Sequence, residues 1–269
     1  MTRIGQAASR LGDLLVAPFG DHAGWALAGA SVGFGLAALL LFKVATPQRR
    51  LARERGQLVG RLYEAALYQT SLPVILRVQR GVLVANLRYL ACALPAVAAL
   101  VVPLVLVLPQ LEARLGRRPL AVGEAALVAA ALPGEVRATL TADRGVAVEA
   151  GPVRDAARGE LVWRVRATAP GAHHLRLDAG GPALDLAVPV AVAGLPALTS
   201  ARQRTALEQL LRDPAGTALP ATSRVTRFAV ALPPRDLRFA GVAVPWLVAF
   251  TVLSLAAGLL LRRSLRVEI

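Results

Sequence analysis

The chain has 269 residues, a formal net charge of +14 and a mean hydropathy of +0.54, and 55% of its residues are hydrophobic. Soluble domains contain only about 45–50% apolar residues even when glycine is counted, so the composition excludes an ordinary soluble domain and predicts an integral membrane protein. The single cysteine, Cys92, excludes an intramolecular disulfide and a cysteine metal site. An exported domain of this chain must therefore fold on its hydrophobic core alone.

Two segments precede the first predicted loop. Residues 1–23 carry apolar side chains at helical spacing between positions 4 and 19, which is typical of a short amphipathic helix at the membrane surface; an ordered leader is the alternative. Residues 24–42 contain no charged residue and are the first predicted transmembrane helix. As a helix they would be about 28 Å long, close to the roughly 30 Å of hydrocarbon in a bilayer.

Residues 43–88 form a basic segment that sets the predicted topology. They hold nine Lys or Arg residues against two acids, and so carry +7 of the net charge. Positive loops stay in the cytoplasm, because translocating them against the membrane potential and away from anionic lipid is costly. The segment is therefore predicted to be cytosolic, with the N-terminus outside. Because membrane insertion accounts for the basic charge, we expect no nucleic-acid recognition.

The same segment predicts a helical hairpin. Thr46 and Pro47 are a typical helix start, and residues 71–73 (Ser-Leu-Pro) separate this helix from a second one that continues into the next span. Apolar residues recur at helical spacing in both, which predicts a hairpin that is basic outside and apolar along its seam. A pair of amphipathic helices resting on anionic headgroups is the alternative. The candidate contacts with a client protein or with lipid are Arg49, Arg50, Arg53, Arg55 and Arg61.

Two further uncharged stretches predict two more transmembrane helices. Residues 89–109 contain Pro95 and Pro103, which are candidate kinks because proline frees a backbone carbonyl. Residues 239–261 form the third predicted span, and the basic tail of residues 262–269 returns to the cytoplasm. The protein is therefore expected to cross the membrane three times.

Residues 110–238 predict an all-β domain on the outer side of the membrane. Apolar and polar residues alternate in short segments separated by Pro-Gly, Asp-Arg-Gly and Ala-Pro-Gly turns, which is typical of a small antiparallel β-sandwich, Ig-like in the loose sense. Trp163 is expected in its core. One helix is predicted over residues 199–212, with Leu207, Leu210 and Leu211 directed inward. The candidate strands are residues 125–132, 136–142, 146–153, 161–167, 173–178, 184–192 and 224–232.

No pattern of residues predicts catalysis. The sequence has no phosphate-binding loop, no Gly-x-Ser-x-Gly nucleophile elbow and no His-Glu-x-x-His zinc motif. His173 and His174 are adjacent, so in a strand they point to opposite faces and do not readily chelate one ion. None of the predicted spans carries an internal charge, which argues against an ion-coupled transporter. We therefore expect a non-enzymatic protein without a cofactor or metal.

The order of a first span, a basic cytosolic hairpin and a second span over residues 24–109 resembles the YidC-like insertase superfamily, especially its three-helix branch, with residues 239–261 as the third helix. In that superfamily the hairpin meets ribosomes or targeting factors, and the helices frame a groove that lowers the cost of moving polar segments into the bilayer. The chain differs by a domain of about 130 residues between its second and third spans. It also has no clear counterpart of the groove's intramembrane positive residue.

The segments TPQRRLARER, LRVQRGVLVANLRYL and LLRRSLRVEI also look like those of uncharacterised bacterial three-span membrane proteins, which implies the bacterial inner membrane and a periplasmic β domain. Two functions follow as hypotheses. The protein either assists the insertion or assembly of other membrane proteins, with nascent chains as partners, or is a membrane-anchored scaffold whose β-sandwich binds a partner or a membrane complex.

Overall fold

The structure is a computed structural model of the whole chain, and it describes residues 10, 12, 13, 16–67, 72–134, 136–239 and 241–263. Most of the predicted surface helix over residues 4–19 and of the tail over residues 262–269 lies outside the described residues. The chain divides into two compact units. One combines residues 1–29 with 105–249, and the other combines residues 30–104 with 250–269.

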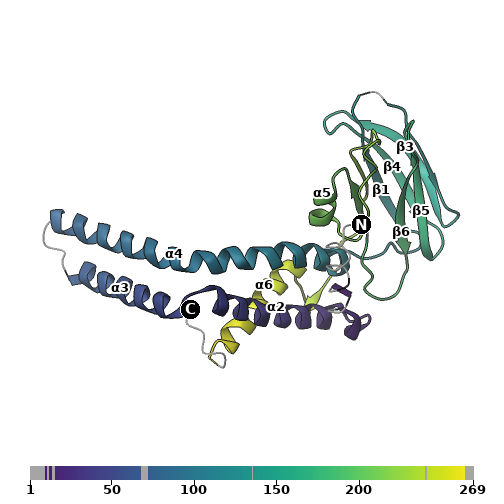
Figure 1. Cartoon of the computed structure of the whole chain (residues 1–269). Helices are drawn as coiled ribbons and strands as arrows, with labels where there is room; N and C mark the ends of the chain where they lie inside the picture. The colour runs from purple at the N-terminus through teal and green to yellow at the C-terminus, as the bar shows by residue number, and fades with distance from the viewer. Residues whose placement is uncertain are drawn as a thin grey trace. The chain divides into compact units, whose positions relative to one another are not determined.

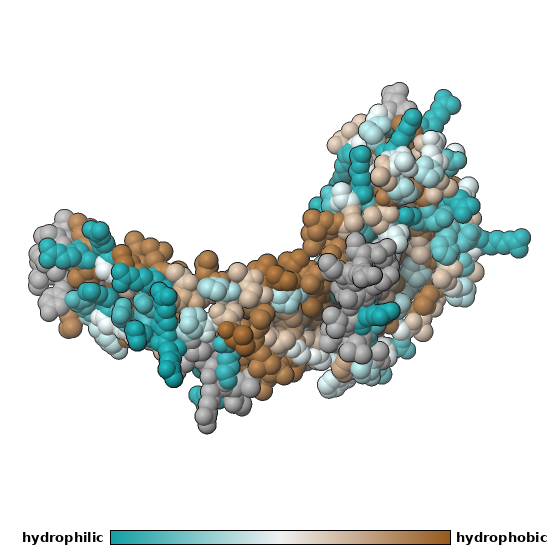
Figure 2. All heavy atoms as spheres, in the orientation of Figure 1, coloured by the Kyte–Doolittle hydropathy of each residue, from teal (hydrophilic) through white to brown (hydrophobic). Residues whose placement is uncertain are grey.

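Long helices occupy the predicted spans and hairpin (Figure 1). The helices are η1 (Ala17–Phe19), α2 (Ala23–Ala45), α3 (Gln48–Leu67), α4 (Leu72–Leu111) and α6 (Trp246–Leu261). By length and composition, α2 and the stretch Ile75–Gly116 are each long and apolar enough to cross a membrane. Figure 2 shows hydrophobic side chains gathered where α6 and the second half of α4 lie, and hydrophilic ones over the hairpin of α3 and the start of α4.

Helix α6 is shorter than the third predicted span. Strands β9 (Arg238–Phe239) and β10 (Val242–Ala243) pair before it, with Gly241 at φ 84° in the turn. The helix then begins after Pro245, whose carbonyl accepts the first helical hydrogen bond, from the Ala249 amide. Proline has no N–H to donate, so it suits a helix start. The resulting 16-residue helix is about 24 Å long, and a third transmembrane crossing remains a prediction.

Small residues let α2 and α6 approach closely within the helical unit. A Cβ atom on Gly35 would collide with the backbone carbonyl oxygen of Ser254 and lie 3.2 Å from the Cβ atom of Ala257. Next to this contact, the rings of Phe34 and Phe250 pack with their centroids 5.3 Å apart in a tilted arrangement. Glycine at position 35 is therefore required by packing.

Helix α4 runs without a break from Leu72 to Leu111, through both Pro95 and Pro103, so the second hairpin helix continues into the apolar stretch as the sequence predicts. Interior prolines are tolerated in such segments because neighbouring helices can supply partners for the backbone carbonyls that proline leaves without a hydrogen bond. Whether the axis bends at either proline remains a prediction.

Beyond α4 the chain makes a π-helical turn, η2 (Glu112–Gly116), which holds a fully buried Arg114. The Arg114 guanidinium donates to Gln110 Oε1 at 2.7 Å and to Asp13 Oδ1 at 2.6 Å. Within the same turn, Glu112 Oε2 accepts a hydrogen bond from Trp246 Nε1 at 2.6 Å. Charged and polar side chains thus tie the N-terminal segment and the start of α6 to the end of α4.

The other unit contains antiparallel sheets, in agreement with the predicted β domain (Figure 1). A five-stranded sheet has the order β3-β4-β1-β8-β7, and a three-stranded sheet has the order β2-β5-β6. The strands are β1 (Ala125–Ala131), β2 (Thr139–Ala142), β3 (Val146–Asp155), β4 (Glu160–Ala167), β5 (Gly171–Asp178), β6 (Leu184–Val190), β7 (Ala201–Gln203) and β8 (Arg227–Val230).

One hydrophobic core joins the two larger sheets. Alternate residues of β1, β4 and β6 are buried in a single cluster, together with Leu175 and Leu177 of β5 and Phe228 and Val230 of β8. Trp163 is buried in this cluster, which confirms its predicted place in the core. Alternation with a period of two brings one face of each strand inward, so the sequence pattern and the packing agree.

The helix predicted over residues 199–212 is wrong in its first half. Strand β7 occupies Ala201–Gln203, and helix α5 covers only Ala206–Arg212, with Thr205 as its N-cap. Its buried side chain is Gln209, and Leu210 is half-buried, whereas Leu207 and Leu211 are exposed. The physical reason is that the Gln209 side chain accepts a hydrogen bond from the backbone N–H of Gln203 at 2.6 Å and donates one to the backbone carbonyl of Ala201 at 3.1 Å. The inward position of α5 therefore pairs with the backbone of β7.

Candidate binding groove of the helical hairpin

The arginines singled out in the sequence lie on helix α3, which begins directly after Pro47 and ends at Leu67. Arg49, Arg50, Arg53, Arg55 and Arg61 are all exposed. Arg61 alone among these five lines the groove between α3 and α4; the other four belong to the exposed surface of α3. The structure therefore separates one predicted contact residue from the rest.

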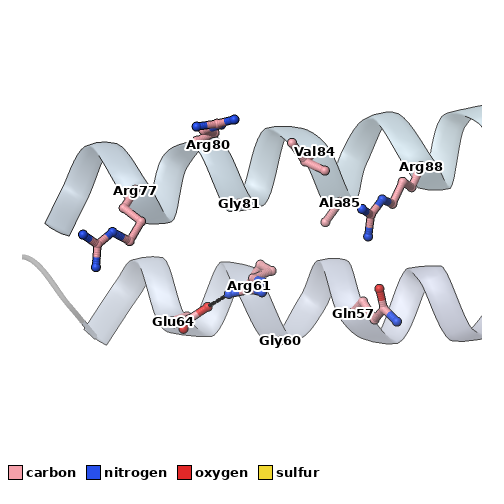
Figure 3. Close-up of a pocket in the computed structure, with 10 residues that line it drawn as sticks. All are labelled: Gln57, Gly60, Arg61, Glu64, Arg77, Arg80, Gly81, Val84, Ala85 and Arg88. Atoms are coloured by element: carbon pink, nitrogen blue, oxygen red, sulfur yellow. Dashed lines mark hydrogen bonds and ion pairs between the residues drawn. The ribbon is translucent and has the colours of Figure 1, made fainter. Parts of the chain in front are cut away.

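An open groove of about 660 Å³ lies between the two hairpin helices (Figure 3). Its polar lining comes from both helices, and two glycines, Ala85 and Val84 form the remainder. Figure 3 shows the Arg77 and Arg88 side chains directed from α4 toward α3, and Arg80 directed away from it. The groove is lined by Gln57, Gly60, Arg61, Glu64, Arg77, Arg80, Gly81, Val84, Ala85 and Arg88.

The groove has an excess of positive charge. Arg61 donates to Glu64 at 2.7 Å, an exposed pair one helical turn apart. Within the part of the chain that the structure describes, Arg77, Arg80 and Arg88 have no acidic side chain within ion-pair distance. A guanidinium group without an acidic partner presents several fixed N–H donors, whose geometry matches a carboxylate or a phosphate. The arrangement can bind an anionic group.

Small side chains leave the groove open at its centre. A Cβ atom on Gly81 would lie 3.6 Å from Cδ of Arg61, so the arginine stem already rests against the glycine. Ala85 is buried one turn further along α4. The predicted apolar seam is therefore interrupted here by polar side chains, whose stems pack while their charged ends reach solvent.

Large apolar side chains are exposed on the same hairpin. Leu62 on α3 is 50% exposed and Leu83 on α4 is 58% exposed. Their neighbours Tyr63 and Leu87 are also exposed. A basic groove beside exposed leucines is a surface that fits an amphipathic or partly apolar segment, because burial of apolar area adds to the charge attraction.

Sequence reasoning missed Arg77, Arg80 and Arg88 as contact residues, although it counted them in the basic segment. The signal was present, because positions 77, 81, 84 and 88 recur at helical spacing and so share one face of α4. Position 61 could not be paired with that face from sequence, since the angle and register of the two helices decide which residues oppose one another.

No family model, curated protein or solved structure matches this chain.

Proposed function

We propose that the protein is a non-enzymatic integral membrane protein that assists the insertion or assembly of other membrane proteins, and that the groove between α3 and α4 receives a segment of the client. The observation that carries the proposal is the open groove with three arginines lacking an acidic partner in the described chain. It lies beside exposed leucines, on a hairpin that joins α2 to the apolar stretch of α4. Resemblance to the YidC-like superfamily is in keeping with this role.

The proposal includes a topology. The N-terminus lies outside the bacterial inner membrane, the hairpin and the C-terminus lie in the cytosol, and α6 with its flanking residues completes a third span. An Ig-like β-sandwich then occupies the periplasm. The excess of Lys and Arg between α2 and the apolar part of α4 supports this orientation, since positive loops remain cytosolic.

Photo-crosslinking in native membranes tests the client contact. A probe at Leu62, exposed on the hairpin, is expected to capture nascent membrane proteins. The variant Arg77→Glu/Arg88→Glu should abolish these adducts, because it reverses two groove charges. The matched control Arg49→Glu/Arg53→Glu makes the same change in net charge outside the groove, and so has the same effect on the charge bias that sets topology.

Three outcomes decide the matter. Loss of adducts in the groove variant alone supports the proposal. Equal loss in both variants contradicts the proposal and points to inverted topology or to unspecific attraction. Capture of one mature membrane complex and no nascent chain also contradicts the proposal, and it favours the scaffold hypothesis. A cysteine-accessibility assay of the hairpin in each variant separates inverted topology from unspecific attraction.

A further inference from the structure

The outward face of the five-stranded sheet carries a second concavity, far from the hairpin in the sequence. The strand registers place Val162 opposite Ala129, Ala129 opposite Ala229, and Ala229 opposite Ala201. Their neighbours along the strands, such as Val128 and Phe228, are buried in the core, so this row lies on the opposite face of the sheet, where Ala201 and Ala229 are only 6% and 8% exposed. Because three of its four residues are alanines, the row forms the floor of a trench across the sheet.

Larger side chains wall the trench on both sides. Leu127, 54% exposed, stands in the row on one side. In the row on the other side, Glu160 and Arg227 both oppose Ala131. The groove that these residues enclose has a volume of about 620 Å³, enough to accept several side chains of a peptide.

The trench ends at a rigid polar wall near β7. Asp213, 4% exposed, lines it, and its Oδ2 accepts hydrogen bonds from the Ser200 amide at 2.7 Å, the Ser200 hydroxyl at 2.6 Å and the Ala201 amide at 2.8 Å. These bonds fix the segment before β7 against α5. The trench is thus a preformed feature of the fold, and its occupation requires little ordering.

Four arginines against two acids give the trench an excess of positive charge. Three of the arginines make long ion pairs: Arg117 with Glu112 at 3.3 Å, Arg158 with Asp155 at 3.7 Å and Arg227 with Glu160 at 3.4 Å. Long ion pairs that solvent can reach are weak and exchange readily for a better acceptor. The fourth, Arg212, has no ion pair within the described ranges.

The trench begins where α4 ends. Arg117 lines it and is the first residue after η2, whose Glu112 also holds Trp246 at the start of α6. If α4 crosses the membrane as proposed, the trench lies where segments of other membrane proteins emerge from the outer leaflet. Such segments are depleted of Lys and Arg by the rule that keeps positive loops in the cytoplasm, so their remaining charge is mostly acidic.

We infer that this trench binds an acidic peptide segment with apolar residues, from the outer juxtamembrane part of another membrane protein. Carboxylates of the peptide exchange with the weak acidic partners of the trench arginines, and an apolar side chain covers the alanine floor beside Leu127. The site is separate from the hairpin groove, and the inference stands whether or not the hairpin binds clients.

Fluorescence anisotropy of a labelled peptide of alternating glutamate and leucine tests this on the full chain in phosphatidylcholine nanodiscs. The protein carries Arg77→Glu and Arg88→Glu, so that the hairpin groove does not contribute. The glutamate–leucine peptide is expected to bind, whereas a matched peptide of alternating lysine and leucine is expected not to bind. Ala129→Leu fills the floor and should weaken binding by about tenfold or more, equivalent to ~1.4 kcal/mol.

Arg212→Glu gives a second readout that does not alter the sheet, because Arg212 is exposed. It should weaken binding strongly, whereas Arg238→Glu, an equal charge change at an exposed position outside the trench, should have little effect. Equal binding with and without Ala129→Leu in this background, or equal loss in the two arginine variants, overturns the inference. If short-chain phosphatidylglycerol binds in an Arg212-dependent way and the peptide does not, the occupant is a lipid headgroup and the peptide assignment is wrong.

Discussion

The buried carboxylate of Asp213 should be among the most sensitive positions of the β domain. Replacing it by alanine removes the acceptor of two backbone N–H groups and of the Ser200 hydroxyl, all close to the start of β7. Leaving a buried donor unpaired costs about 1–3 kcal/mol, so two amides alone imply a loss of about 2–6 kcal/mol. For a unit of this size, that corresponds to a fall of about 5–20 °C in the unfolding midpoint.

Thermal unfolding of the purified full chain, followed by tryptophan fluorescence, measures this loss, since the buried Trp163 reports on the core. Asp213→Asn keeps an amide oxygen as acceptor and should lose only about 1–2 kcal/mol. Asp185→Ala is the matched control, because Asp185 pairs with Arg176 at the exposed surface, and its midpoint should barely change. If Asp213→Ala unfolds at the temperature of Asp185→Ala, the buried bonds do not stabilise the domain and the reasoning fails.

The same residue predicts a dependence on pH. Burial raises the pKa of Asp213 above its ordinary value of 3.8 and outweighs the hydrogen bonds from Ser200 and Ala201, which act in the opposite direction. An acid with a raised folded-state pKa adds stability that is complete below its unfolded pKa and is lost as pH rises through the folded pKa. The stability of wild type relative to Asp213→Asn should therefore increase as pH is lowered toward 3.8, and a constant difference across that range would be inconsistent with this account.

Two further predictions concern other parts of the fold. The hydrogen bond from Arg118 lowers the pKa of Glu124 below its ordinary value of 4.5. Glu124→Gln should therefore destabilise the β domain modestly at neutral pH, by about 0.5–1 kcal/mol. This difference should vanish as pH falls through the folded-state pKa, and unfolding midpoints over a pH series measure it. Gly35→Leu should destabilise the helical unit by about 1–3 kcal/mol or more, because its side chain meets the Ser254 carbonyl, whereas Gly33→Leu, where a Cβ atom meets open space, should be tolerated in the same detergent-stability assay.

Much of the fold could be predicted because its signals are local. The alternation of apolar and polar residues around Trp163 predicted strand β4 and its inward face. The uncharged run before the basic segment predicted an apolar helix. Strand β7 could not be predicted in this way, because it is three residues long and its stability comes from Gln209 and Asp213, which follow it in sequence. The leucines of α5 suggested an inward apolar face that the short helix does not have.

The candidate sites were harder to predict, because each depends on register. Arg61 joins Arg77 and Arg88 only through the alignment of α3 with α4, and the alanine floor exists only because four strands place positions 162, 129, 229 and 201 in one row. Arg114 was also missed as a buried residue. Its position just after an apolar helix suggests an exposed flank, and its burial becomes understandable once the hydrogen bonds to Asp13 and Gln110 are known.

If the apolar helices hold the protein in a membrane, as proposed, the two edge strands of the five-stranded sheet acquire a further role. Side chains of Gln209 and Asp213 occupy the outer hydrogen-bonding groups of β7, and β3 at the opposite end has register shifts between Val148 and Ala150 and between Ala150 and Val153. Irregular or occupied edges do not accept another strand. Tethering to a membrane raises the local two-dimensional concentration of such domains and aligns them, which favours strand-to-strand polymerisation. This sheet is protected against it, so neighbouring copies can crowd without forming extended β-structure.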